Sequence, residues 1–192
     1  MAQILKDKEL LDKYQFSLQT IVSSIDKAIN DESKQLLDDV VLGIQMLYNL
    51  HSILDSAEIV EQAHNYCVSM YFCSLIEKAL RVFYCYLAEQ EIYIPKNDLT
   101  LGSLLRPDNQ YLLKAFEERQ IKNLVFFLSH SNPDNIGHDY RNSLAHLKDI
   151  EPMDYTLQLT STILLLFTDV INTIFLYLYP PKKEDDVSND QL

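Results

Sequence analysis

The chain has 192 residues and a formal net charge of −12, with only three glycines and six prolines. A chain of this length can bury about two thirds of the surface that it exposes when unfolded, so it needs no disulfide or metal to fold. The acidic balance argues against tight, non-specific nucleic-acid binding, because such binding depends on neutralising phosphates with lysine and arginine. Few helix breakers and no strand-like alternation predict an all-α protein.

The cysteine content indicates the redox environment. Cys67, Cys73 and Cys85 are odd in number, fall on expected helices and have no Cys-x-x-Cys spacing. This pattern favours free thiols in a reducing cytoplasm over disulfides or a metal site.

Two segments bear on membrane targeting. Residues 1–13 carry too many charges for a signal peptide. Residues 163–179 are apolar, but 17 residues are short for a membrane span, and Asp169 and Asn172 interrupt them. We therefore expect a cytoplasmic protein that does not engage a membrane, with a buried core helix in this segment.

The N-terminal third predicts two helices. Apolar residues recur at helical spacing over 2–29 and 33–55, and polar capping residues at 30–33 separate the two runs. We expect residues 1–57 to form a helical hairpin that packs on the rest of the protein. Two interpretations stay open, since this pair could simply extend the bundle or could add a surface for dimerisation or partner binding.

A long third helix is predicted over 58–92. Its residues are apolar on nearly all sides, which is typical of a helix at the centre of a bundle. Glu77 and Arg81 are four positions apart on it and can form an ion pair.

The second half of the chain alternates between expected helices and polar links. We expect a short turn over 100–105 capped by Thr100, then a helix over 109–130 and a polar loop over 130–137. A short helix that ends at Glu151 should follow, and then a last helix over 153–179 with Pro152 in its first turn. Residues 180–192 should form a disordered acidic tail.

The short helix after the polar loop carries the most informative residues. Gly137 is expected in a turn and Asp139 at the helix N-cap. Arg141 then falls in the first helical turn and His146 in the second. Residues five apart are separated by about 140° around an ideal helix, so this pair does not share a face, whereas Asn142 and His146 do. A two-fold partner could complete such a cluster.

This region is also the least acidic part of the chain. Between Arg119 and Lys148 there are four cations, two acids and three histidines. A local positive site is compatible with an acidic protein, because the distribution of charge matters more than its total.

The pattern Arg141-Asn142-x-x-Ala145-His146 resembles the signature of the HEPN superfamily (higher eukaryotes and prokaryotes nucleotide-binding), in which Arg-Asn is followed after a few residues by His. The resemblance covers roughly residues 64–179. It implies an up-and-down helical bundle of HEPN type over 58–179. It also implies a homodimer whose composite site cuts RNA without a metal or other cofactor.

Two upstream segments are similar to recurrent features of bacterial members, namely Glu77-x-x-Leu80-Arg81 and the sequence TLGSLL at 100–105. The ion pair of Glu77 and Arg81 has two interpretations. It is a structural pair at a solvated edge, or one of its members lies near the Arg–His cluster and orients it.

The chemistry expected from this resemblance uses the 2′-hydroxyl of RNA as the nucleophile. His146 would transfer protons, because histidine titrates near neutral pH. Arg141 would bind the scissile phosphate through two nitrogens, and Asn142 would fix the imidazole or contact the phosphate. His138 could line the same cleft, although a surface loop histidine is the simpler interpretation.

We therefore expect an endoribonuclease that acts as a toxin or phage-defence effector, regulated by an antitoxin or sensor protein. One alternative is a HEPN-fold adaptor that binds a nucleotide, RNA or protein without chemistry. Another is a purely structural helical protein in which the motif arises by chance. A metal site built from His130, His138, Asp139 and His146 matches no known ligand spacing.

Overall fold

A computed structural model describes residues 1–29, 35–54, 58–89, 99–106, 108–129, 139–146 and 156–181. Within these ranges 84% of the residues are helical and none lies in a strand, which confirms the all-α prediction. The elements are α1 (Ala2–Lys6), α2 (Lys8–Ile29), α3 (Gln35–Ser52), α4 (Glu58–Leu87), α5 (Leu101–Leu104), the 3-10 helix η1 (Leu112–Lys114), α6 (Glu118–Leu128), α7 (Tyr140–His146) and α8 (Leu157–Leu178).

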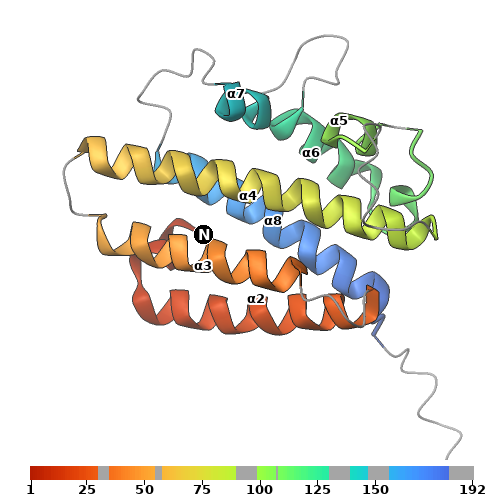
Figure 1. Ribbon diagram of the computed structural model, residues 1–192, viewed down its shortest axis with the longest axis horizontal. Coiled ribbons are helices and arrows are strands. Elements are labelled where there is room, and N and C mark those ends of the chain that lie inside the picture. The colour runs from red at the N-terminus through yellow and green to blue at the C-terminus, as the bar shows by residue number, and fades with distance from the viewer. Residues whose placement is uncertain are drawn as a thin grey trace, which may run out of the picture.

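The helices form three layers (Figure 1). Helices α4 and α8 pack along each other in the middle, α2 and α3 cover one side, and α5, α6 and α7 lie on the other side of α4. The aromatic rings of Phe72 on α4 and Phe167 on α8 meet edge to face, with centroids 5.2 Å apart and no solvent exposure. The central position of α4 explains why its sequence is apolar on nearly all sides.

A buried polar contact links the two central helices. The hydroxyl of Thr160 on α8 donates a hydrogen bond of 2.7 Å to Oδ1 of Asn65 on α4 and lies 3.1 Å from the hydroxyl of Ser69. Such pairing satisfies polar groups that would be costly to bury alone, so it favours one register of α4 against α8.

The prediction of a single helix over 2–29 is wrong. The chain is extended at Asp7, which separates α1 from α2. The Asp7 carboxylate accepts hydrogen bonds from the backbone N–H groups of Glu9 at 2.9 Å and Leu10 at 3.2 Å. Asp7 therefore caps α2, and this local capping outweighs the helical periodicity that runs through the break.

The single helix predicted over 109–130 is also wrong. Here η1 and α6 are separate elements, because Glu117 has extended backbone angles. The N–H of Glu117 donates to Oε1 of Gln120 at 3.0 Å, so the Gln120 side chain stabilises the start of α6.

Two further helix limits differ from those predicted. Helix α4 ends at Leu87 rather than residue 92, and Glu89 has a positive φ of 52°. Helix α8 begins at Leu157, after the extended N-cap residue Thr156, so Pro152 does not lie in its first turn. In contrast, the predicted turn at 100–105 is confirmed, since Thr100 caps α5 by accepting from the N–H of Ser103 at 3.3 Å.

Other predicted links lie outside the described residues. These are the break at 30–33, the loop over 130–137 with Gly137, the helix end at Glu151, and residues 182–192 of the expected tail.

Within the described part of the chain, α8 is the one helix long and apolar enough to cross a membrane. Of its most apolar window, 56% is buried inside the bundle. A core helix passes the same test of length and composition, and this extent of burial favours the core helix expected over 163–179.

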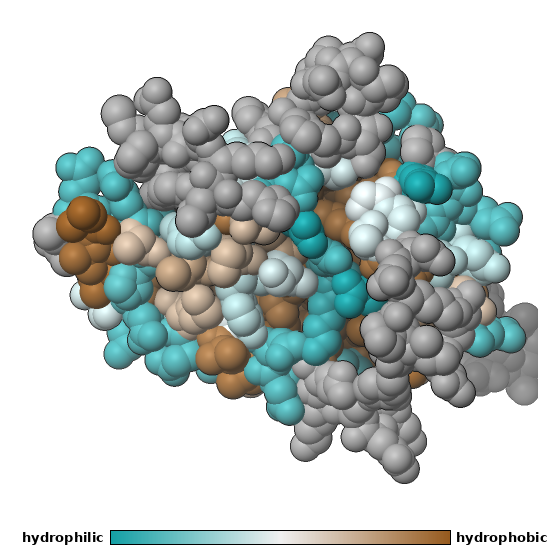
Figure 2. All heavy atoms as spheres, turned by 45° about the horizontal axis from the view of Figure 1, so that its top comes forward, coloured by the Kyte–Doolittle hydropathy of each residue, from teal (hydrophilic) through white to brown (hydrophobic). Residues whose placement is uncertain are grey.

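The face that carries α5, α6 and α7 is seen in Figure 2. Hydrophilic residues cross the middle of this view, and more hydrophobic residues lie on either side of them. In this view, the band of hydrophilic residues therefore separates two hydrophobic areas of the described residues. The polar cluster described next lies on this side of the bundle.

Candidate functional site

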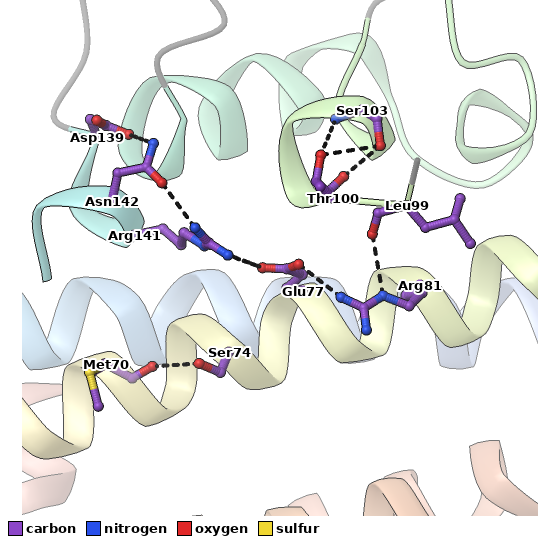
Figure 3. A network of polar contacts seen from close by, with 10 residues as sticks. All are labelled: Met70, Ser74, Glu77, Arg81, Leu99, Thr100, Ser103, Asp139, Arg141 and Asn142. Atoms are coloured by element: carbon purple, nitrogen blue, oxygen red, sulfur yellow. Dashed lines mark hydrogen bonds and ion pairs between the residues drawn. The ribbon is translucent and has the colours of Figure 1, made fainter. Parts of the chain in front are cut away.

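A buried carboxylate on α4 joins two arginines (Figure 3). Oε1 of Glu77 accepts a hydrogen bond of 2.8 Å from Nη2 of Arg81. Oε2 of the same side chain accepts from Arg141, at 3.3 Å from Nε and 3.2 Å from Nη2. Only 12% of the Glu77 side chain is exposed. Since Arg81 lies one turn further along α4 and Arg141 lies on α7, Glu77 ties the two helices together.

The cluster continues from Arg141 along α7. Nη1 of Arg141 donates to Oδ1 of Asn142 at 3.0 Å, and Nδ2 of Asn142 donates to Oδ1 of Asp139 at 2.8 Å. Asp139 is buried, and its backbone oxygen accepts from the N–H of Ser143 at 2.9 Å. Its φ is 47°, a conformation that aspartate tolerates better than most residues. A continuous chain of hydrogen bonds therefore runs from Asp139 to Arg81.

Helix α7 is held in place by its neighbours as well as by Glu77. The Tyr66 hydroxyl on α4 donates to the backbone oxygen of Leu144 at 2.9 Å, and the Leu144 side chain is fully buried. The ring of Tyr140 stacks on Phe127 of α6, with centroids 6.2 Å apart. These contacts fix the position of α7, and therefore of Arg141, against α4, although α7 has only seven residues.

Charge is distributed unevenly through the cluster. The carboxylates of Glu77 and Asp139 are on the buried side, whereas 37% of the Arg141 side chain and 42% of the Arg81 side chain are exposed. The outer side is therefore cationic. Behind it, burial raises the pKa of the Cys73 thiol to about 12, and the positive charge of Arg141 acts against this shift.

Arg81 has a second anchor. Its Nε donates to the backbone oxygen of Leu99 at 3.3 Å, just before α5 (Figure 3). The guanidinium of Arg81 is thus fixed by α4 on one side and by the chain entering α5 on the other.

The structure brings together three of the five residues expected at the site, namely Glu77, Arg141 and Asn142. The backbone of His146 ends α7, but its side chain lies outside the description, as does all of His138. The roles expected for these two histidines stay predictions. Glu77 and Arg81 do form an ion pair, as the structural interpretation expects. Glu77 also contacts Arg141, as expected if the pair orients the Arg–His cluster.

Sequence reasoning did not find two features of this cluster. The hydrogen bond between Asp139 and Asn142 could have been suspected from their spacing of three at a helix start. The convergence of Arg81 and Arg141 on one carboxylate was not predicted either, although one interpretation placed a member of the Glu77–Arg81 pair near Arg141, since Glu77 and Arg141 are 64 positions apart.

Among the described residues, no group of three or more His, Cys, Asp or Glu side chains could hold a metal ion. His130, His138 and the side chain of His146 are not part of that set. The four-residue metal site weighed above therefore stays untested.

Comparisons with known proteins assign no family to this chain. No protein-family model, no curated protein and no solved structure matches it significantly. The resemblance to HEPN domains therefore rests on the residues named above.

Proposed function

We propose that this protein is a metal-independent endoribonuclease of HEPN type that acts as a homodimer. Arg141 would bind the scissile phosphate, and His146 would transfer protons. The observation that carries the proposal is the two-point contact of Glu77 with Nε and Nη2 of Arg141. It fixes the plane of the guanidinium while 37% of the Arg141 side chain stays exposed.

The remaining hydrogen-bonding capacity of Arg141 supports a role in binding. A guanidinium has five N–H donors in a rigid fork. Within the described residues, three of its hydrogen bonds go to Glu77 and Asn142. Two N–H groups are left over, and the partial exposure of the side chain would allow a phosphate oxygen to reach them.

The proposed reaction is a transesterification. The 2′-oxygen of the RNA attacks the adjacent phosphorus, the bond from phosphorus to the 5′-oxygen breaks, and the products carry a 2′,3′-cyclic phosphate and a 5′-hydroxyl. One histidine accepts the 2′-hydroxyl proton and a second gives a proton to the 5′-oxygen. A homodimer would supply both histidines, and the arginines would stabilise the charge on the phosphate.

The biological setting follows from the same proposal. An endoribonuclease of this type would act in the cytoplasm as a toxin or phage-defence effector, held in check by an antitoxin or triggered by a sensor protein. The net charge of −12 suits selective cutting better than bulk RNA degradation, because weak general attraction to phosphate leaves recognition to local contacts.

The test is to incubate the purified protein with RNA in EDTA, beside His146→Ala and Arg141→Ala. Wild type should produce fragments ending in 2′,3′-cyclic phosphate. His146→Ala should lose about 10²–10⁴-fold in rate, as is typical when a general acid–base group is removed. Arg141→Ala should lose about 10²–10³-fold, as is typical when a group that stabilises transition-state charge is removed. Lys27→Ala, at an exposed position of α2 on the other side of the bundle, is the matched control and should cleave like wild type. Equal cleavage by all four proteins, or none by inhibitor-free wild type, would overturn the proposal.

One observation favours a second candidate, a HEPN-fold module that binds without chemistry. Three donors of Arg141 are already engaged inside the chain, as they would be if the arginine served mainly to attach α7 to α4. This candidate predicts RNA or nucleotide binding that persists through prolonged incubation with no product.

A further inference from the structure

Two guanidiniums converge on Glu77, although one would neutralise it. Arg81 and Arg141 contact the two oxygens of a single carboxylate, Arg81 at Oε1 and Arg141 at Oε2 (Figure 3). The other carboxylate of the cluster, on Asp139, is bonded to Asn142 and is 2% exposed. The surface therefore presents two arginines, while the acids that balance them lie beneath.

Arg81 keeps donors available after its internal contacts. Among the described residues, its hydrogen bonds are those from Nη2 to Glu77 and from Nε to Leu99. The other three of its five N–H groups are on Nη1 and Nη2, at the end of the side chain. Of the whole Arg81 side chain, 42% is exposed. Because two anchors already restrict the guanidinium, it would lose less conformational entropy on binding an anion than a free surface arginine does.

We propose that Arg81 and Arg141 form a two-arginine phosphate site, in which Arg81 binds the RNA phosphate next to the one held by Arg141. This inference rests on the proposed endoribonuclease function, and it assigns Arg81 to substrate binding. Glu77 is a positioning residue here, since it sets the spacing of the two guanidiniums. The site is local, which reconciles RNA binding with a protein whose net charge is −12.

The salt dependence of binding distinguishes a phosphate contact from a structural role. Each phosphate neutralised on a single strand contributes about 0.7 to the slope of log K against log salt concentration. Arg81→Gln should therefore reduce the slope by about 0.7 and weaken binding roughly tenfold at low salt. Arg81→Lys should keep the slope, because the charge remains, and should lose affinity by a smaller factor.

The experiment measures fluorescence anisotropy of a 2′-O-methyl RNA oligonucleotide that has no terminal phosphate, titrated with the full chain at several KCl concentrations. This probe lacks the attacking hydroxyl and cannot be cleaved, so binding is read without chemistry. Lys27→Gln removes the same charge from an exposed site on α2, on the other side of the bundle, and is the matched control. Thermal unfolding of each variant verifies folding, and Arg81→Lys carries the test if Arg81→Gln does not fold.

The outcomes separate this inference from the proposed function. The Arg81 site would be overturned if Arg81→Gln had the same slope as Lys27→Gln, or if wild type did not bind. If only Arg81→Lys folds, full affinity in that variant would overturn the site. Adenosine monophosphate is the second probe. If Arg81→Gln loses affinity for adenosine monophosphate but not for the RNA oligonucleotide, Arg81 binds a terminal phosphate and the RNA assignment is overturned. Normal binding with no cleavage of unmodified RNA would remove the endoribonuclease proposal while the phosphate site stands.

Discussion

Arg141 and Glu77 are 64 positions apart in the chain, yet Nε and Nη2 of the arginine both donate to Oε2 of the glutamate, at 3.3 and 3.2 Å. This contact attaches α7 to the central helix α4. We expect Glu77→Gln to lower the free energy of unfolding by about 1–3 kcal/mol, because it removes the negative charge and replaces one of the two buried acceptor oxygens by an amide donor that faces a guanidinium. The lower end of this range is expected, since both arginines are partly exposed and can rehydrate. Urea unfolding measures the change.

The matched control for that substitution is Glu118→Gln. Glu118 pairs with Lys122 at 2.7 Å, but both side chains are more than two-thirds exposed. Such a pair contributes little to stability, so no measurable change is expected. If the two glutamine variants unfold at the same urea concentration, Glu77 does not connect the helices as described.

The buried carboxyl group of Asp26 should give the protein an unusual dependence of stability on pH. It is buried, and its Oδ2 accepts from the N–H of Leu37 at 2.8 Å, near the start of α3. Burial raises the pKa of Asp26 above its usual 3.8, and the hydrogen bond from Leu37 only partly offsets this. The folded state therefore favours the protonated form, and stability from this group is lost as pH rises through the raised pKa.

Asp26→Asn mimics the protonated form and should be more stable than wild type at pH 7, with the difference closing as pH falls towards 4. Asp26→Ala should instead lose about 1 kcal/mol at pH 7, because it removes the acceptor near the helix start. Thermal unfolding between pH 4 and 7 measures both. A wild type that exceeds Asp26→Asn at pH 7 and loses this advantage in acid would contradict the expected direction.

Gly43 marks the close approach of α3 to α4. A Cβ added there would lie 3.1 Å from Cζ of Phe72 and 3.1 Å from Cε1 of Tyr71. Neither ring moves easily, since Phe72 is fully buried and the Tyr71 hydroxyl is bonded to the backbone oxygen of Asp39 at 2.9 Å. Alanine normally stabilises a helix by about 1 kcal/mol relative to glycine. Here overpacking should reverse that gain, and Gly43→Ala should lose about 1 kcal/mol.

Chemical denaturation compares Gly43→Ala with Gln45→Ala, which lies on the exposed side of the same helix and should change stability by less than about 0.5 kcal/mol. A stabilised Gly43→Ala would mean that α3 and α4 are further apart than the structure has them.

The three cysteines should differ in reactivity. Cys67 is exposed, whereas Cys73 and Cys85 are buried. With its pKa raised to about 12 by burial, Cys73 would be thiolate in only about one molecule in ten thousand at pH 8. Iodoacetamide followed by mass spectrometry should show rapid labelling of Cys67 alone in the native protein and of all three in urea. Comparable native rates for Cys67 and Cys73 would show that the α4 core is open near Arg141.

Several elements were predictable from local sequence because their causes are local. The all-round apolar character of α4 predicted a central helix, and Thr100 at the start of the short segment over 100–105 predicted the cap of α5. The breaks at Asp7 and Glu117 were missed, because apolar periodicity continues across both. A single capping side chain changes the backbone at one residue and leaves that periodicity intact.

The sequence by itself determined the helical class, most of the helices and the residue types of the candidate site, because helix hydrogen bonds and caps join residues a few positions apart. Only the tertiary structure decided that Glu77 holds Arg81 and Arg141 together and that the acids of this cluster are buried while the arginines reach solvent. The reason is that these contacts depend on how α7 packs against α4, and spacing along the chain carries no information about the distance between helices so far apart in sequence.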